Sequence, residues 1–208
     1  MRFVFDTYAW IEYFKGSATG TKVKRIVESE ENEIFTSVMT IAELSSKLKR
    51  ESDMELDYNN STITYDWVKG YKNKVSDPYY LYNYGDAKGC PQNGTTSTPG
   101  ACANGWTQEN VSYVSYGSEF SYPFPEIYGT AGGNSKQWQQ ISLYTYLKYG
   151  KNMYIPGLLS QSQACAQRGC VGTDNTPDQA WSQLWTQLNS DTRTAQSLQY
   201  STDIKWRK

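Results

Sequence analysis

The density of charged residues falls sharply near residue 53 of this chain of 208 residues. The first 53 residues hold 17 Lys, Arg, Asp and Glu residues, or about one in three, whereas the remaining 155 residues hold 24. Tyrosine changes in the opposite direction, since 16 of the 18 tyrosines follow residue 53, as do all four cysteines. A shift of this kind indicates two segments of different origin, which we take as residues 1–53 and 54–208.

The pattern of the first segment predicts two strands and three helices. A short apolar run precedes Asp6, as in a buried strand of a parallel sheet. Thr7 can cap the helix that follows, and Gly16 can end it. The expected elements are strands at residues 3–5 and 33–36 and helices at about residues 7–14, 20–31 and 39–51. This order predicts a βααβα unit.

Two acidic residues follow the predicted strands of this segment. Asp6 stands directly after the first strand, and Glu43 lies in the helix after the second. Acids at the ends of parallel strands meet at the carboxyl edge of the sheet, where ligands bind. Their repulsion favours a hard cation such as Mg²⁺ or Mn²⁺, which can activate water against a phosphodiester. The alternative is that Asp6 only caps a helix and Glu43 only faces solvent.

The runs FVFDTYAWIEYFKGSATGTKVKRIVES and IFTSVMTIAELSSK resemble the first part of a PIN-domain ribonuclease, a fold common among prokaryotic toxin–antitoxin RNases. The resemblance covers about residues 1–51. It implies that Asp6 and Glu43 are the first and second metal-binding acids, with RNA or an antitoxin as partner. Members of this family bring two further acids from a later helix and strand, and nothing after Glu51 continues that pattern. The resemblance therefore implies an incomplete carboxylate site.

The second segment predicts an alternation of strands and helices, which is typical of βα units. The expected strands are residues 54–58, 79–83, 111–116, 124–128 and 153–156, and the expected helices lie near residues 63–75, 134–149 and 177–190. Together with the first segment, this pattern predicts an α/β fold for the whole chain.

The four cysteines form two pairs that are close in sequence. Cys90 and Cys102 flank a loop rich in Gly, Pro, Thr and Ser, and Cys165 lies five residues before Cys170. An even count in a charge-poor segment predicts two local disulfides and an oxidising compartment, with reduced thiols as the alternative. The N-terminus carries no export signal, because Asp6 interrupts its apolar run. The sequence therefore assigns no single compartment.

A second pair of carboxylates lies among aromatic residues. Asp57 closes a predicted strand, and Glu126 lies in the run YPFPEIY. Tyr and Trp rings stack on sugars while polar side chains bind the hydroxyls, and two carboxylates can cleave a glycosidic bond. This pair predicts a module that binds or cleaves a glycan. The alternative is that Asp57 starts a turn and Glu126 binds neighbouring backbone.

The runs YYLYNYGDAKGCP, YPFPEIYGTAGGNSKQWQQISLY and QACAQRGCVGTDNTP are similar to the C-terminal part of secreted bacterial glycoside-hydrolase-like proteins, which have a barrel of βα units. The similarity covers residues 54–208. It implies a partial barrel, because the positions of the earlier strands hold the PIN-like segment. The two resemblances together predict a chimera.

Three absences limit the chemistry. The chain has no histidine, which excludes Ser-His-Asp and Cys-His dyads and His-ligated zinc. The mean hydropathy of −0.70 and the lack of an apolar run of about 20 residues argue against a membrane span. Charges of 20 Lys and Arg against 21 Asp and Glu do not predict a basic nucleic-acid surface. The remaining function classes are a metal-dependent hydrolase of RNA and an exported glycan module.

Overall fold

The computed structural model describes residues 2–29, 31–36, 61–74, 81–170 and 174–206. The chain divides into two compact units, Met1–Asn59 and Asn60–Lys208. The predicted division between residues 53 and 54 lies outside the described residues, as do the predicted helix at 39–51 and the predicted strand at 54–58.

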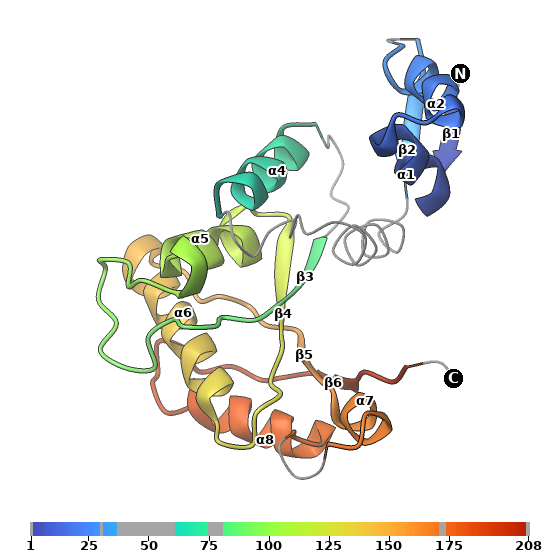
Figure 1. The fold of residues 1–208 in the computed structure, drawn as a ribbon. Coiled ribbons are helices and arrows are strands. Elements are labelled where there is room, and N and C mark those ends of the chain that lie inside the picture. The colour runs from blue at the N-terminus through green and yellow to red at the C-terminus, as the bar shows by residue number, and fades with distance from the viewer. Residues whose placement is uncertain (1, 30, 37–60, 75–80, 171–173, 207–208) are drawn as a thin grey trace. The chain divides into compact units, whose positions relative to one another are not determined.

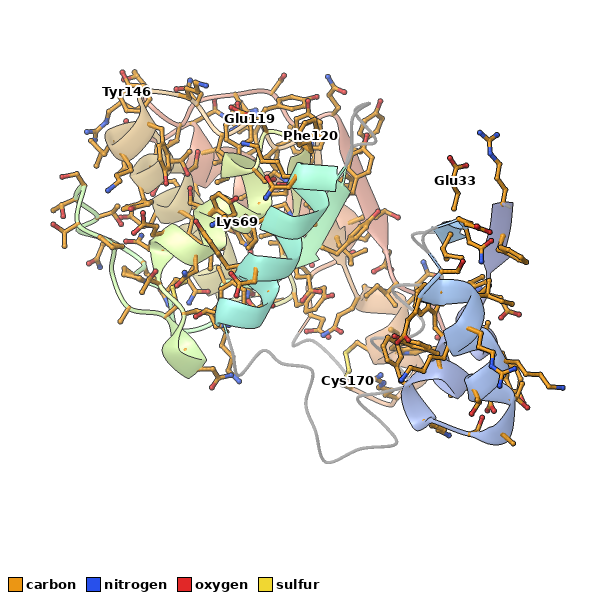
Figure 2. The ribbon with its side chains drawn as sticks, turned by 90° about the horizontal axis from the view of Figure 1, so that it is seen from above. Glu33, Lys69, Glu119, Phe120, Tyr146 and Cys170 are labelled. Atoms are coloured by element: carbon orange, nitrogen blue, oxygen red, sulfur yellow. A yellow bond between two sulfur atoms is a disulfide. The ribbon has the colours of Figure 1, made fainter. Side chains whose placement is uncertain are left out.

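The described residues of the first unit form two parallel strands and two helices (Figure 1). Its elements are β1 (Arg2–Phe5), α1 (Thr7–Lys15), α2 (Ala18–Val27) and β2 (Glu33–Thr36). The strands pair in register, with Arg2 opposite Glu33 and Phe5 opposite Thr36. An ion pair of 2.7 Å joins the side chains of Arg2 and Glu33 (Figure 2). The predicted order of strand, helix, helix and strand is confirmed.

The limits of α1 follow from its two end residues. Asp6 caps the helix, and its Oδ1 accepts a hydrogen bond of 2.9 Å from the Ala9 backbone N–H. The prediction that Thr7 is the cap is wrong, because Thr7 is already the first helical residue and Asp6 stands before it in extended backbone. Gly16 ends the helix in the left-handed region at φ 62°, as predicted.

The second unit contains the remaining helices and strands. Its elements are α4 (Ser61–Lys74), β3 (Leu81–Gly85), η1 (Ala103–Gly105), α5 (Gln108–Ser112), the π-helix η2 (Tyr113–Gly117), β4 (Ser121–Pro125), α6 (Gly133–Tyr149), β5 (Gly157–Ser160), α7 (Ser162–Gln167), α8 (Pro177–Leu188) and β6 (Tyr200–Asp203).

The four strands of this unit run parallel in chain order. β3 pairs with β4, and β5 pairs with β6. A single parallel bridge between Glu126 and Leu159 connects the two pairs. Figure 1 shows the helices α5, α6 and α8 on one side of these strands. The α/β class is therefore confirmed, as small parallel sheets with helices, and the strands among the described residues form no closed barrel.

The core of the second unit lies between the strands and these helices. Trp138 and Ile141 of α6 are buried together with Leu184 of α8. They share one hydrophobic cluster with Ile127, directly beyond β4, and Leu158 of β5. Burial of such side chains contributes roughly 1.5–3 kcal/mol each, so this cluster fixes the helices against one face of the strands.

The predicted strand at residues 111–116 is wrong, because this stretch is helical in α5 and η2. Thr107 and Asn110 form a reciprocal capping box that starts α5. The Thr107 Oγ1 accepts from the Asn110 N–H at 3.2 Å, and the Asn110 Oδ1 accepts from the Thr107 N–H at 3.1 Å. These local bonds outweigh the strand preference of the Val and Tyr residues that follow.

The other predicted elements of the second unit differ mainly at their ends. The helices α4, α6 and α8 are confirmed within a few residues. The strand predicted at residues 153–156 is wrong, because β5 begins only at Gly157, while Met153 and Ile155 are buried in the core outside any strand. Neither α7 nor β6 was predicted.

Both predicted disulfides are confirmed. Cys90 is joined to Cys102, and Cys165 is joined to Cys170 (Figure 2). The first bond closes the long loop after β3, and the second closes the turn at the end of α7. Both bonds therefore restrain loops of the second unit.

Candidate functional site

Asp6 lies at the carboxyl end of β1, where the sequence predicts a metal ligand. The parallel register sets Phe5 opposite Thr36, so both strands of the first unit end at the same edge. The Asp6 side chain is exposed. Its Oδ1 holds the N-terminus of α1 through the Ala9 N–H, which fixes the orientation of the carboxylate. Among the described residues no hydrogen bond to the Asp6 Oδ2 is found, so this oxygen can take a ligand.

The partners predicted for Asp6 and Glu126 lie outside the part of the chain that the structure describes. These are Glu43 for Asp6 and Asp57 for Glu126. The two predicted carboxylate pairs therefore stay predictions.

The donor type of Asp6 suits a divalent cation, because Mg²⁺ and Mn²⁺ prefer carboxylate oxygens. Among the described residues, the one group of three potential ligands within 4.8 Å of one another is Cys165, Cys170 and Asp174. Its sulfur atoms form a disulfide and are not thiolates, so this group is no metal site.

Glu126 lies at the carboxyl edge of the strands in the second unit, beside Asp86. Gly85 is the register partner of Pro125, and the Glu126 N–H donates to the Gly85 carbonyl at 3.0 Å. Asp86 and Glu126 therefore follow the ends of two neighbouring parallel strands. This edge is where ligands bind in parallel α/β sheets.

Asp86 occupies a partly buried position next to α6. The Asn134 Nδ2 donates to its Oδ1 at 3.3 Å, and burial raises the pKa of the carboxyl group above its ordinary value of 3.8. Sequence reasoning did not select Asp86 for this edge. The predicted strand ends at residue 83, whereas β3 ends at Gly85, directly before Asp86, as β1 ends directly before Asp6.

A third acid at this edge, Asp203, has a structural role. Its Oδ1 accepts hydrogen bonds of 2.7 Å from the Ser160 hydroxyl and from the Ser162 backbone N–H. Its Oδ2 accepts at 3.0 Å from the Gln163 N–H. Asp203 therefore ties the end of β6 to the start of α7.

Aromatic side chains line the other face of the strands. On β3, Tyr82 is 46% exposed and Tyr84 is 53% exposed. The Tyr84 ring lies 5.2 Å from that of Phe124, and the Tyr82 ring lies 6.2 Å from that of Tyr122. Tyr122 in turn meets Tyr154 edge-on at 5.6 Å. We call these five residues the aromatic face.

A cavity of about 570 Å³ opens at the amino edge of β4. We call it the tyrosine cleft, because five tyrosines and a lysine line it together with smaller residues and Glu119. The tyrosines and the lysine are Tyr65, Tyr113, Tyr116, Tyr122, Tyr149 and Lys151. The sequence predicted aromatic residues around Asp57 and Glu126 but not this cleft, because its tyrosines come from separate helices and strands.

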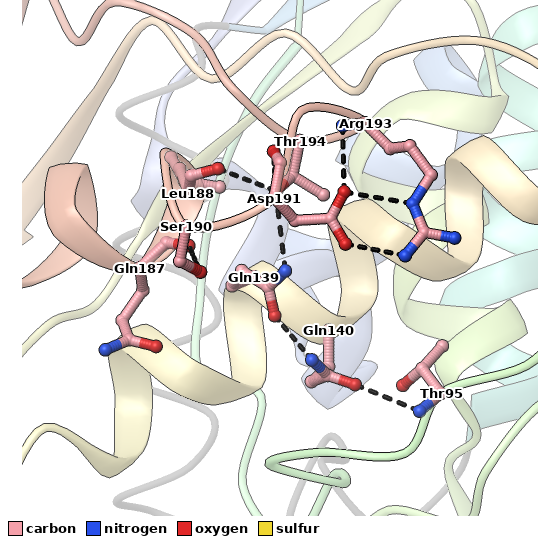
Figure 3. Close-up of polar contacts among 9 residues, drawn as sticks. All are labelled: Thr95, Gln139, Gln140, Gln187, Leu188, Ser190, Asp191, Arg193 and Thr194. Carbon is pink, nitrogen blue, oxygen red and sulfur yellow. Dashed lines mark hydrogen bonds and ion pairs between the residues drawn. The ribbon is translucent and has the colours of Figure 1, made fainter.

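A second cavity, of about 440 Å³, is lined mostly by amide and hydroxyl side chains of α6 and the turn after α8. Figure 3 shows that these groups bind one another. The Gln140 Oε1 accepts from the Thr95 N–H at 3.0 Å, and the Gln139 Nε2 donates to the Thr194 hydroxyl at 3.4 Å. Because these amides already hold the loop and the turn to α6, this cavity has a structural explanation.

The turn beside this cavity carries a charged pair. The Arg193 guanidinium donates to both oxygens of Asp191, at 2.9 and 2.6 Å (Figure 3). These hydrogen bonds lower the pKa of Asp191 to about 2. The pair therefore stays charged at neutral pH and closes the turn locally.

The described helices include none long and apolar enough to cross a membrane.

The comparisons with known proteins concern the start of the chain. A family model of the PIN domain matches residues 3–72, about a third of the chain. This range is longer than the predicted 1–51 and includes most of α4. No curated protein and no solved structure matches the chain. Neither the glycoside-hydrolase-like resemblance nor the chimera gains support. PIN domains have a nuclease-like fold and generally bind divalent metal ions, and the comparisons support a PIN-domain segment at residues 3–72.

Proposed function

We propose that the PIN-domain segment is a divalent-metal-dependent endoribonuclease in which Asp6 and Glu43 hold Mg²⁺ or Mn²⁺. The observation that carries this proposal is the position of Asp6, directly after β1 at the edge where the parallel strand β2 also ends. The match of residues 3–72 to the PIN-domain model supports RNA as substrate and an antitoxin as a regulatory partner.

The residues of the chain have distinct roles in this proposal. The hydrogen bond from the Ala9 N–H holds the Asp6 carboxylate in one orientation, so its second oxygen is positioned before a ligand arrives. Glu43 supplies a second hard oxygen. When bound, a divalent cation polarises a phosphate and lowers the pKa of a coordinated water. Because the chain lacks histidine, no imidazole serves as the base.

An RNA cleavage assay tests the proposal. We expect the full chain to cleave a single-stranded RNA in Mg²⁺ or Mn²⁺ and to lose this activity in a chelator. Asp6→Asn keeps a good helix cap but removes the charge, so it should lower the cleavage rate on the order of 100-fold. Glu43→Gln should do the same. The matched control is Glu33→Gln, at the opposite edge of the same sheet. Equal rates for Asp6→Asn and the unmodified chain would refute the proposal.

A second candidate function is glycoside cleavage at the carboxyl edge of the second unit. It is favoured by the neighbouring positions of Asp86 and Glu126 and by the raised pKa of Asp86, which suits a carboxyl group that donates a proton. The sequence predicts Asp57 as the partner of Glu126, and Asp86 is the acid that follows the end of the neighbouring strand β3.

The second candidate has its own test. We expect the full chain to release reducing ends from a bacterial cell-wall glycan and Glu126→Gln to abolish the release. Glu109→Gln, on α5, is the matched control. Release that is unchanged in Glu126→Gln would exclude this candidate.

A further inference from the structure

We propose that the tyrosine cleft binds a short oligosaccharide. The cleft lies at the amino edge of β4, whereas Asp86 and Glu126 follow the carboxyl ends of β3 and β4. The inference goes beyond both functions proposed above, because binding in the cleft requires neither Asp6 nor Glu126.

The cleft combines aromatic residues from four elements. Tyr65 comes from α4, Tyr113 and Tyr116 from η2, Tyr122 from β4 and Tyr149 from the end of α6. The volume of about 570 Å³ falls within the range of small-ligand sites. Tyr149 is 43% exposed, so the cleft is open to a ligand from solvent.

The backbone beside the cleft departs from regular helix geometry. In η2 the Ser118 N–H donates to the Tyr113 carbonyl, five residues earlier, at 3.0 Å. Tyr113 and Tyr116 of this turn both line the cleft. Glu119 then adopts a left-handed conformation at φ 68°, which is strained for a residue with a side chain. Such irregular backbone is frequent at binding sites.

The charges at the cleft nearly cancel. The Lys72 ammonium lies 3.1 Å from a carboxylate oxygen of Glu119 (Figure 2 labels Glu119), and this contact lowers the pKa of Glu119. Lys151 adds one positive charge to the lining. Lys72, Glu119 and Lys151 together carry one net positive charge, which favours a neutral or weakly acidic ligand. A nucleic-acid strand requires several phosphate contacts, which these residues do not provide.

The lining matches the chemistry of a sugar ring. Tyrosine rings stack on the apolar face of a pyranose, and their hydroxyl groups bind its hydroxyls. Phenols with their ordinary pKa of 10 keep their protons at neutral pH, and partial burial raises the pKa of Tyr113 and Tyr149 further. A purely apolar ligand would remove water from these hydroxyls without replacing their hydrogen bonds.

The cleft is continuous with the aromatic face. Tyr122 lines the cleft and also contacts Tyr82 and Tyr154, at 6.2 and 5.6 Å between ring centroids. A sugar bound in the cleft can therefore extend as a chain over further aromatic rings. This continuity favours an oligosaccharide over a single sugar.

Calorimetric titration of the full chain tests this inference. The probes are cellotetraose, xylotetraose, chitotetraose and tetragalacturonate, with a tetranucleotide RNA as the competing ligand class. We expect at least one tetrasaccharide to bind, Tyr116→Ala and Tyr149→Ala to weaken it about 10-fold or more, and Tyr149→Phe to weaken it less because the ring remains. Tyr200→Ala, at an exposed tyrosine that does not line the cleft, should leave binding unchanged.

Each contrary result overturns the inference. In the first, none of the four tetrasaccharides binds. In the second, a tetrasaccharide binds but Tyr149→Ala does not weaken its binding. In the third, the RNA probe binds in the cleft with greater affinity than the sugars. Near-ultraviolet circular dichroism establishes that each variant retains its tertiary packing. If Tyr116→Ala unfolds the chain, Tyr149→Phe and Tyr149→Ala at the exposed end of α6 still decide the question.

Discussion

Tyr65 of α4 and Tyr113 of η2 stack with their ring centroids 4.2 Å apart. A second contact, between Lys72 and Glu119, joins the same two regions at 3.1 Å. The PIN-domain match ends at residue 72, whereas the first compact unit ends at Asn59. The last part of the matched range is therefore packed within the second unit.

This contact predicts that Tyr65 stabilises the second unit. Tyr65→Ala removes a partly buried ring and its stacking contact with Tyr113. We therefore expect the free energy of unfolding to fall by about 2 kcal/mol. Tyr65→Phe keeps the ring and should change it by less than about 0.5 kcal/mol. Urea unfolding followed by tryptophan fluorescence measures both free energies. The control is Asp66→Ala, at the exposed neighbouring residue. If Asp66→Ala lowers the free energy of unfolding as much as Tyr65→Ala does, the prediction is contradicted.

Asp86 predicts a pH dependence of stability. Burial raises its pKa in the folded chain, so the charged form is less favourable when folded than when unfolded. The stability that the neutral Asp86 side chain contributes is complete below pH 3.8, the ordinary pKa. This stability is lost as the pH rises through the raised pKa of the folded chain. Asp86→Asn removes this loss and still accepts from Asn134, so the variant should be more stable than the unmodified chain at pH 7.

The difference between the two chains should disappear near pH 3, where both side chains are neutral. Thermal unfolding between pH 3 and pH 7 measures it, with Asp66→Asn as an exposed control. A difference that stays constant across this range would show that the charge of Asp86 is not the cause.

Removal of each disulfide should lower the free energy of unfolding by a different amount. The Cys90–Cys102 bond joins residues 12 apart in sequence, and the Cys165–Cys170 bond joins residues five apart. On loop-closure entropy, replacing the first pair by serine should reduce the free energy of unfolding by about 3 kcal/mol and the second by about 2 kcal/mol. Chemical unfolding of the two double variants compares them. The reverse order would mean that loop length does not govern their effects.

Local patterns predicted the elements whose hydrophobic spacing or end residues are distinctive. The apolar run before Asp6 predicted β1, and α6 agrees with the helix predicted near residues 134–149. The prediction of a strand at residues 111–116 was wrong because the Val and Tyr content of this stretch favours a strand, whereas the capping box at Thr107 starts a helix. β6 was missed because its four residues alternate between exposed and half-buried positions and pair with the distant β5.

The candidate sites were predictable only where one residue carries the signal. Asp6 follows a strand and was found from that position. Asp86 also directly follows a strand, β3, but the strand predicted from the sequence ends three residues before it. The tyrosine cleft depends on the packing of α4 against η2, and no sequence spacing relates Tyr65 to Tyr149.

The most direct test of the proposed metal site is a titration of the full chain with Mn²⁺, followed by electron paramagnetic resonance. We predict that the unmodified chain binds about one Mn²⁺ and that Asp6→Asn and Glu43→Gln each weaken binding about 10-fold or more, while Glu33→Gln does not. Mn²⁺ binding of equal strength in the unmodified chain and in Asp6→Asn would contradict the assignment of Asp6 as a ligand.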